Sequence, residues 1–189
     1  MPHVADFPDA AISDDAFMKL ALAEADRAFA EDEVPIGGGD RCVSTKAAAR
    51  ARLLASAHNR CEAHGDPTAH AELVAIRTAC AAVGAVRLDR ATLYSTIEPC
   101  AMCAGAILHA RIERVVFGAH DPKFGAAGSV VDLLSGADPK VGKFNHRVAL
   151  TAGMLAEASR DLMQRFFQRK RAEAKANALE VALPSPTIE

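Results

Sequence analysis

The chain of 189 residues has no long apolar run, no strong excess of charge of either sign, and few cysteines. Because no stretch of about 18 apolar residues is present, we expect no transmembrane helix. The N-terminus has neither a basic segment nor an apolar core, so we expect no secretory signal. No internal repeat is evident, and the length suits one domain with a proper hydrophobic core.

Charge and cysteine content narrow the class of protein further. A net charge of −2 does not indicate a nucleic-acid-binding protein, although such binding depends on a local basic stripe rather than on the total. The cysteines number five, and only Cys100 and Cys103 form a close pair. An odd count with one close pair argues for metal ligation in a reducing compartment, such as the cytoplasm, rather than for a disulfide framework.

Helical and extended patterns alternate along the chain and predict an α/β fold. Helices are expected over residues 13–31, 68–83 and 155–176, and from Pro99 onward. Strands are expected over residues 91–96 and 114–118 and, with a weaker pattern, over 148–150. Helices interleaved with strands indicate a layered domain, which we assign to residues 13–176. Residues 1–12 and 177–189 are expected to be terminal tails.

One segment after the first predicted helix is unusual. Residues 38–52 begin with glycines, continue rich in Ala and Arg, and contain almost no large apolar side chain. Glycine loses the most backbone freedom on folding, and Ala and Arg favour helix over strand. We therefore predict a mobile loop or an irregular helical turn there. An edge strand, if one forms, is expected from residues 53–57.

The clearest chemical signal comes from two short motifs. His70 and Glu72 belong to a His-Ala-Glu motif, and Cys100 and Cys103 belong to Pro-Cys-Ala-Met-Cys at residues 99–103. One imidazole and two thiolates supply three ligands for a catalytic zinc ion and leave the fourth tetrahedral position for water. Glu72 is not needed as a ligand and is well placed to move protons. This combination is the signature of the zinc nucleobase deaminases.

Both motifs begin predicted helices, so two helix N-termini are expected to point at the metal. Their field favours thiolate over thiol, and the i, i+3 spacing of Cys100 and Cys103 places both sulfurs on one helix face. Glu72 is expected to take a proton from the water and deliver it to the ring nitrogen beside the carbon under attack. The same carboxyl group then protonates the departing amino group.

An alternative interpretation treats the cysteine pair as half of a structural zinc site. The remaining ligands would then come from the other cysteines, which are Cys42, Cys61 and Cys80. That interpretation leaves Glu72 without a role. Cys80 lies on an apolar helix face and is expected in the core, and the histidines other than His70 are expected to make ordinary hydrogen bonds.

Longer segments around the motifs resemble the bacterial tRNA-specific adenosine deaminases. The segments most specific to this family are Asp-Pro-Thr-Ala-His-Ala-Glu at residues 66–72 and Phe-Gly-Ala-His-Asp-Pro-Lys at residues 117–123. The similarity runs from about residue 15 to residue 175. The resemblance implies a cytidine-deaminase-like fold with three α/β/α layers and a mixed five-stranded sheet, usually in a homodimer. It also implies hydrolysis of adenosine to inosine at the wobble position of a tRNA anticodon loop.

The resemblance further implies roles for individual residues. His70, Cys100 and Cys103 match the ligands of one zinc ion per chain, and Glu72 matches the proton shuttle. The expected substrate and RNA contacts are Asn59, which holds the flipped nucleoside, together with Ala71, Asp121, Lys123, Phe166, Phe167 and Arg171. Aromatic rings beside cations suit a splayed loop in which bases stack and phosphates pair. For any single residue of the last helix, a core face with a solvated basic side is an equally good interpretation.

Two other functions stay open at this point. One is a deaminase of free bases or nucleosides, such as guanine or cytosine, with the same fold; the basic last helix and the narrow motifs argue against it. The other is an RNA-binding module with a structural zinc. Glu72 argues against this second alternative, because a structural site has no use for its carboxylate.

Overall fold

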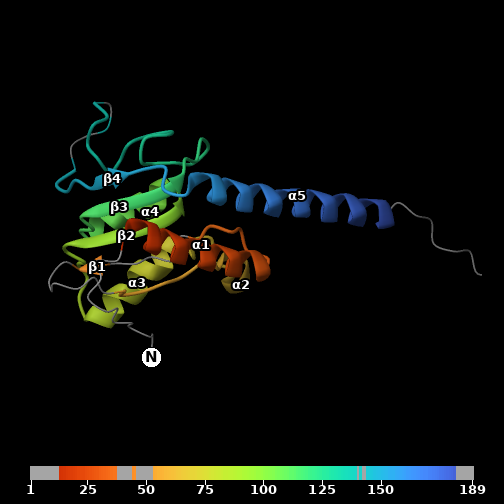
Figure 1. Ribbon diagram of the computed structural model, residues 1–189, viewed down its shortest axis with the longest axis horizontal. Coiled ribbons are helices and arrows are strands. Elements are labelled where there is room, and N and C mark those ends of the chain that lie inside the picture. The colour runs from red at the N-terminus through yellow and green to blue at the C-terminus, as the bar shows by residue number, and fades with distance from the viewer. Residues whose placement is uncertain (1–12, 38–43, 46–52, 140, 142–143, 182–189) are drawn as a thin grey trace, which may run out of the picture.

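The computed structural model describes residues 13–37, 44–45, 53–139, 141 and 144–181. In chain order its elements are α1 (Asp14–Ala30), β1 (Ser44–Thr45), α2 (Cys61–His64), α3 (Ala71–Val83), β2 (Ala91–Ile97), α4 (Ala101–His109), β3 (Arg114–Ala119), β4 (Ala149–Thr151) and α5 (Ala156–Val181) (Figure 1). Within these described ranges, no helix is both long and apolar enough to cross a membrane.

The strands form one mixed sheet in the order β1-β2-β3-β4. Strand β1 is antiparallel to β2, whereas β2, β3 and β4 run parallel to one another. The register places Leu93 opposite Val115 and Val115 opposite Leu150. Parallel neighbours need a crossover connection, and α4 supplies it between β2 and β3. The α/β class predicted from the alternating patterns is therefore confirmed.

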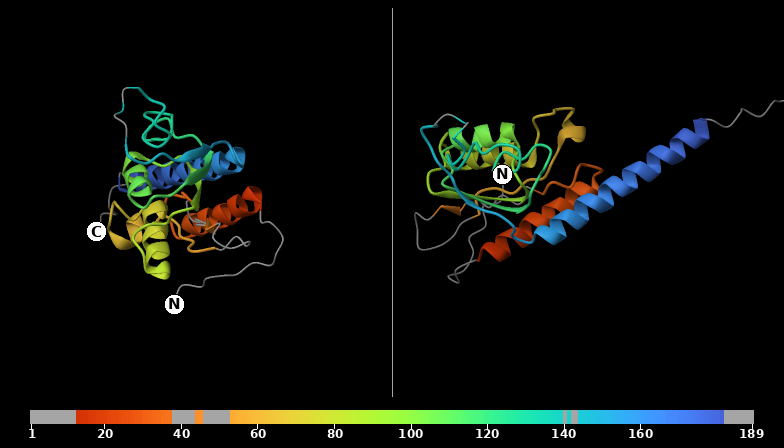
Figure 2. Two further views of the ribbon diagram at one scale, coloured as in Figure 1. Left: turned by 90° about the vertical axis from the view of Figure 1, so that its left-hand side faces the viewer. Right: turned by 90° about the horizontal axis from the view of Figure 1, so that it is seen from above.

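Helices cover both faces of this sheet, with α1 and α5 on one side and α3 and α4 on the other (Figure 2). The side chains of β3 alternate between the two resulting cores. Val115 and Phe117 face the larger core with α3 and α4, whereas Val116 joins Tyr94 and Phe17 on the α1 side. Burial on both faces explains why β3 is apolar after Arg114, and it stabilises the fold by about 1.5–3 kcal/mol for each large apolar side chain.

The helix ends agree only in part with those predicted from the local sequence. Ser13 caps α1, as its sequence predicts, because its hydroxyl accepts a hydrogen bond from the Ala16 amide. Helix α3 begins later than predicted, because the Thr68 amide and hydroxyl donate to the Asp66 carboxylate in a turn. Helix α5 continues to Val181, beyond the end predicted for it.

The expectation for the segment before α2 is corrected in part. Residues 44–45 form a strand that pairs with the beginning of β2, so this stretch enters the sheet. Residues 38–43 and 46–52 lie outside the described part of the chain. Residues 53–57 form no strand, although Leu54 and Ala55 are buried in the larger core. The described sheet therefore has four strands, whereas five were expected.

Candidate active site

Two helix N-termini meet just beyond the end of β2. His70 is the N-cap residue of α3, and Cys100 is the N-cap residue of α4. Cys103 is buried in the first turn of α4. Because β2 ends at Ile97, the turn that leaves the sheet carries the first thiol directly to the start of the next helix. Two helix N-termini therefore meet at the motifs as predicted, although α4 begins at Ala101 rather than at Pro99.

The three candidate ligands lie at the spacing that a tetrahedral metal ion requires. Nδ1 of His70 is 3.6 Å from Sγ of Cys100 and 3.6 Å from Sγ of Cys103, and all three donor atoms lie within 4.8 Å of one another. Tetrahedral ligands at ordinary Zn–N and Zn–S bond lengths are separated by about 3.6 Å. The donor set therefore fits an ion of this kind, with one coordination position not supplied by these side chains.

In the part of the chain that the structure describes, no fourth His, Cys, Asp or Glu joins this group. Cys61 and Cys80 are free thiols outside it, and Cys80 packs against the larger core as predicted. Cys42, the third cysteine considered as a ligand, lies outside the described residues. Three protein ligands are typical of catalytic sites, whereas structural zinc sites are closed by four.

The surroundings of Cys100 favour its thiolate form. The pKa of Cys100 is lowered to about 4, and a hydrogen bond with the Cys103 side chain is the largest cause. Burial acts in the opposite direction, whereas contacts with His70 and with the Cys103 amide also contribute to the lowering. The position at a helix N-terminus is also typical of reactive thiolates. A thiolate is the form that binds a metal, so the site is electrostatically prepared for one.

Glu72 lies in the first turn of α3 and is almost completely buried. Together with His70 and Cys100 it lines a pocket of about 280 Å³, but it is not part of the metal-binding group. The Ser95 hydroxyl lies 3.1 Å from Oε1 of Glu72 and 2.7 Å from the carbonyl oxygen of Ile97. Sequence reasoning missed Ser95, because a serine inside a strand carries no motif and only the packing of α3 on β2 brings it to Glu72.

Asn59 is also buried, and it is held by a second buried carboxylate. Its Nδ2 donates to Glu33 at 3.1 Å, and the other carboxylate oxygen of Glu33 accepts from the Ala63 amide at 2.8 Å. These bonds fix the amide orientation of Asn59, although the residues that line the pocket at His70 do not include it. The side chain of Ala71, also expected at the substrate, is fully buried within α3.

The loop after β3 forms one wall of the pocket. Asp121 and Phe124 line both the pocket and an adjoining groove of about 620 Å³, which Lys123 and Phe167 also line. Lys123, Phe167 and Arg171 meet again around a neighbouring hollow of about 300 Å³. Four residues predicted from the resemblance are thus brought together beside the site. Phe124, 70% exposed, was not predicted; it is an isolated aromatic residue whose position depends on the loop.

Phe166 and Phe167 have different environments although they are adjacent in α5. Phe166 is 3% exposed and packs edge-on against Phe29, with ring centroids 5.9 Å apart, whereas Phe167 is 42% exposed. The ring of Phe166 therefore belongs to the packing of α1 on α5, and the RNA contact expected of it stays a prediction. Arg169 is likewise engaged: its guanidinium lies 4.3 Å from the Phe29 ring centroid and pairs with Asp32 at 2.8 Å.

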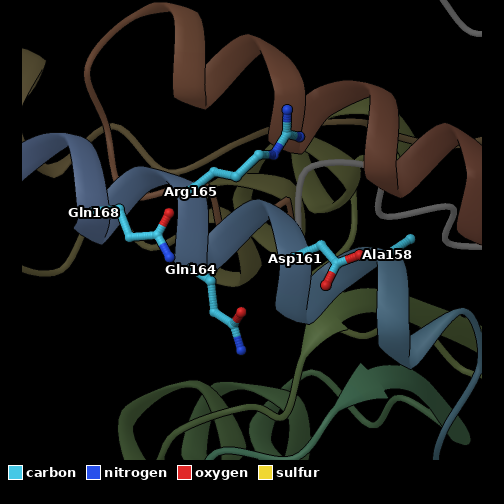
Figure 3. Close-up of a pocket in the computed structure, with 5 residues that line it drawn as sticks. All are labelled: Ala158, Asp161, Gln164, Arg165 and Gln168. Atoms are coloured by element: carbon cyan, nitrogen blue, oxygen red, sulfur yellow. The ribbon is translucent and has the colours of Figure 1, made fainter.

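A further hollow of about 440 Å³ lies along α5 (Figure 3). It is lined by Ala158, Asp161, Gln164, Arg165 and Gln168. In Figure 3 the Arg165 side chain points toward α1, whereas Gln164 points away from it. Because every lining residue comes from one helix, the hollow is an open surface rather than an enclosed site. Gln164 also lines the groove beside the pocket, so the two surfaces are continuous.

Comparison with known proteins gives consistent results. The model of the MafB19-like deaminases matches residues 12–171. A tRNA-specific adenosine deaminase of Bacillus subtilis is 40% identical over 163 residues, covering 86% of this chain and 94% of that protein. A solved structure from studies of A-to-I editing by tRNA:A34 deaminases at the wobble position has a TM-score of 0.67 and 42% identity, and covers 77% of this chain and 97% of that one.

A guanine deaminase from Bacillus subtilis is also similar, with a TM-score of 0.51 and 36% identity over 58% of this chain and 66% of that one. The likeness to the adenosine deaminases extends over more of both chains at higher identity. The fold is therefore the cytidine-deaminase-like α/β fold. On this evidence the chain belongs to the tRNA-specific adenosine deaminases, within the MafB19-like deaminase family.

Proposed function

We propose that this protein hydrolyses adenosine to inosine at the wobble position of a tRNA anticodon, with one zinc ion bound by His70, Cys100 and Cys103. The observation that carries the proposal is the buried carboxylate of Glu72, which lines the same pocket as His70 and Cys100 without belonging to the metal-binding group. A structural metal site does not need such a group, whereas a hydrolytic deaminase needs one to move protons.

When bound, a zinc ion supplies a Lewis acid that brings the pKa of a water molecule toward neutrality. Glu72 accepts the proton that this water loses at a carboxylate oxygen, and delivers it to N1 of adenine as the oxygen adds to C6. Glu72 then takes the remaining proton from the hydroxyl group now on C6 and transfers it to the amino group, so the C6–N bond breaks, C6 keeps a carbonyl oxygen, and ammonia leaves. The overall reaction consumes one water for each adenosine and yields inosine and ammonia, so the atoms balance.

Ser95 supports both protonation states of Glu72. Its hydroxyl donates to the carboxylate when Glu72 is ionised. When Glu72 carries the proton, the hydroxyl can donate to the Ile97 carbonyl oxygen and accept from the carboxylic acid. Glu72 therefore keeps a hydrogen-bonded partner throughout the proton transfers, in a pocket where burial makes an unpartnered polar group costly.

The groove beside the pocket is proposed to hold the nucleotides that flank the reacting base. Lys123 and Arg171 supply positive charge for phosphates, and the exposed rings of Phe124 and Phe167 supply surfaces on which bases stack. Asn59 is proposed to hold the flipped nucleoside and Asp121 to face a neighbouring nucleotide, as the resemblance implies.

Three finer proposals rest on the resemblance alone. We propose a homodimer, a fifth strand in the sheet and a cytoplasmic location. Light scattering on the purified protein tests the first of these, with a mass of twice the 19.9 kDa chain as the expected result.

The experiment that tests the activity is incubation of the zinc-loaded protein with total tRNA, followed by nucleoside mass spectrometry for inosine. Parallel reactions with free adenine, guanine and cytosine measure released ammonia. We expect inosine with tRNA, little ammonia from the free bases, and no inosine with Glu72→Ala protein that retains its zinc. Ammonia from guanine without inosine in tRNA would favour the free-base deaminase, and RNA binding without any deamination would favour the RNA-binding module.

A further inference from the structure

We propose that Glu98 is a positioning residue: it holds the loop of residues 120–129 against the metal-binding turn and so shapes the pocket for a nucleotide. The inference rests on the proposed function, which supplies the substrate. Glu98 lies between the last residue of β2 and Pro99, and none of the sequence motifs assigns it a ligand or proton-transfer role. Its side chain is fully buried.

The carboxylate of Glu98 accepts hydrogen bonds from the loop through both of its oxygens. Backbone amides donate from Asp121 at 3.1 Å, from Ala127 at 2.9 Å and from Ser129 at 3.0 Å. The hydroxyl of Ser129 and Nδ1 of His120, the latter at 3.0 Å, contact the same group. A buried carboxylate is costly unless donors of this kind surround it, so the carboxylate and the loop conformation stabilise each other.

This cluster connects the two sides of the active site. On one side, Glu98 and Pro99 lead directly into Cys100, and the Pro99 carbonyl accepts from the Ala126 amide at 2.8 Å. On the other side, the same loop carries Asp121 and Phe124, which line the pocket beside the metal-binding group. The Glu98 carboxylate therefore holds the pocket wall beside the metal ligands together with the backbone contacts of Pro99 and Cys100 with the loop.

Gly125 shows how closely the loop approaches Glu98. A Cβ at this position would lie 2.5 Å from Cδ of Glu98 and 2.5 Å from the carbonyl oxygen of Asp121. Real Cβ atoms essentially never come so near, so any larger residue at 125 must displace the loop. Gly125→Ala thus offers a second perturbation that moves the loop without altering the carboxylate.

Glu98→Gln is the main test, because it keeps the size of the side chain and replaces one accepting oxygen by a donating amide. Steady-state deamination of an anticodon stem-loop RNA is measured together with zinc content and thermal stability. We expect unchanged zinc content and a KM raised about tenfold or more, since small displacements of binding groups have effects of this size. Gly125→Ala is expected to raise KM similarly.

The matched control is Asp14→Asn, which removes another carboxylate with several donors. Asp14 pairs with Arg114 at the opposite end of β3 and accepts from the Tyr94 hydroxyl. This control is expected to lower the melting temperature and to leave KM unchanged. An unchanged KM in zinc-containing, folded Glu98→Gln protein, or an equal rise in KM in Asp14→Asn, would overturn the positioning role.

Amide hydrogen exchange tests whether Glu98 holds the loop without depending on the deaminase activity of the protein. The amides of Asp121, Ala127 and Ser129 are expected to exchange much faster in Glu98→Gln than in the wild-type protein or in Asp14→Asn. If the wild-type protein does not act on RNA, the proposed function fails, while the exchange rates still decide whether Glu98 holds the loop. Equal exchange in Glu98→Gln and the wild-type protein would refute the inference.

Discussion

Replacing Phe166 and Phe167 by alanine, one at a time, separates the packing role of α5 from its proposed contact with RNA. The two residues are adjacent and chemically identical, so they form a matched pair. Phe166 is buried against Phe29, whereas Phe167 is partly exposed at the groove beside the active site. The structure therefore predicts that Phe166→Ala mainly lowers stability, whereas Phe167→Ala mainly weakens RNA binding.

The magnitudes follow from burial. Truncating a buried phenylalanine to alanine costs about 3–5 kcal/mol. In a domain of this size about 1 kcal/mol shifts the melting temperature by roughly 2–4 °C, so Phe166→Ala is expected to lower it by about 6–20 °C. Phe167→Ala should change stability by about 1 kcal/mol or less. If a base stacks on Phe167, its loss should weaken RNA binding by about 1–3 kcal/mol, or roughly 5- to 150-fold.

The assay combines scanning calorimetry with RNA binding at equal protein and zinc concentrations, because metal binding and association both shift the melting temperature. Binding is measured to an anticodon stem-loop at fixed salt, since phosphate contacts make affinity depend on ionic strength. Two results would refute the reasoning. One is a Phe166→Ala protein that melts like the wild-type protein but no longer binds RNA. The other is a Phe167→Ala protein with unchanged RNA affinity.

Three further predictions concern the site and its surroundings. Chelation should lower the melting temperature and abolish deamination, and about one equivalent of Zn²⁺ per chain should restore both; activity in metal-free protein would contradict this. Ser95→Ala should lower kcat about tenfold with zinc content unchanged; wild-type kcat would remove Ser95 from the mechanism. A hydrogen bond with Glu24 raises the pKa of His58. Protonated His58 therefore stabilises the folded state fully below about pH 6.5, and this stabilisation is lost as the pH rises through the pKa of the folded protein. Urea titrations at increasing pH should show the unfolding free energies of the wild-type and His58→Gln proteins converging. A difference in unfolding free energy that does not change with pH would contradict this.

Much of the fold could be predicted from local patterns. Ser13 caps α1 because its hydroxyl satisfies an amide of the first turn, and this depends only on neighbouring residues. The apolar run around Val115 predicts a buried strand, because a strand covered on both faces is rich in apolar side chains, and it pairs in parallel with the strand around Leu93. The start of α3 was predicted too early, since the sequence pattern does not reveal that Thr68 donates to Asp66 instead of continuing the helix.

The metal-binding group could also be predicted, because the residue types and their separation along the chain are typical of a zinc site. The i, i+3 separation of Cys100 and Cys103 places both thiols on one side of a helix start, whatever surrounds them. His70 comes from another helix, and only the sheet brings it within 3.6 Å of both sulfurs. The RNA contacts assigned to Asn59, Asp121, Lys123, Phe167 and Arg171 stay predictions.

The sequence by itself therefore determined the α/β class, the order of the longer helices and strands, and the candidate metal-binding residues, but not β1 or α2. Only the tertiary structure decided that Ser95 supports Glu72, that Glu98 holds the loop of residues 120–129, and that Phe166 is buried while Phe167 is exposed. The physical reason is the range of the interactions. Caps, helix spacing and strand patterns act within a few residues, whereas burial and hydrogen bonds between elements depend on which distant segments pack together.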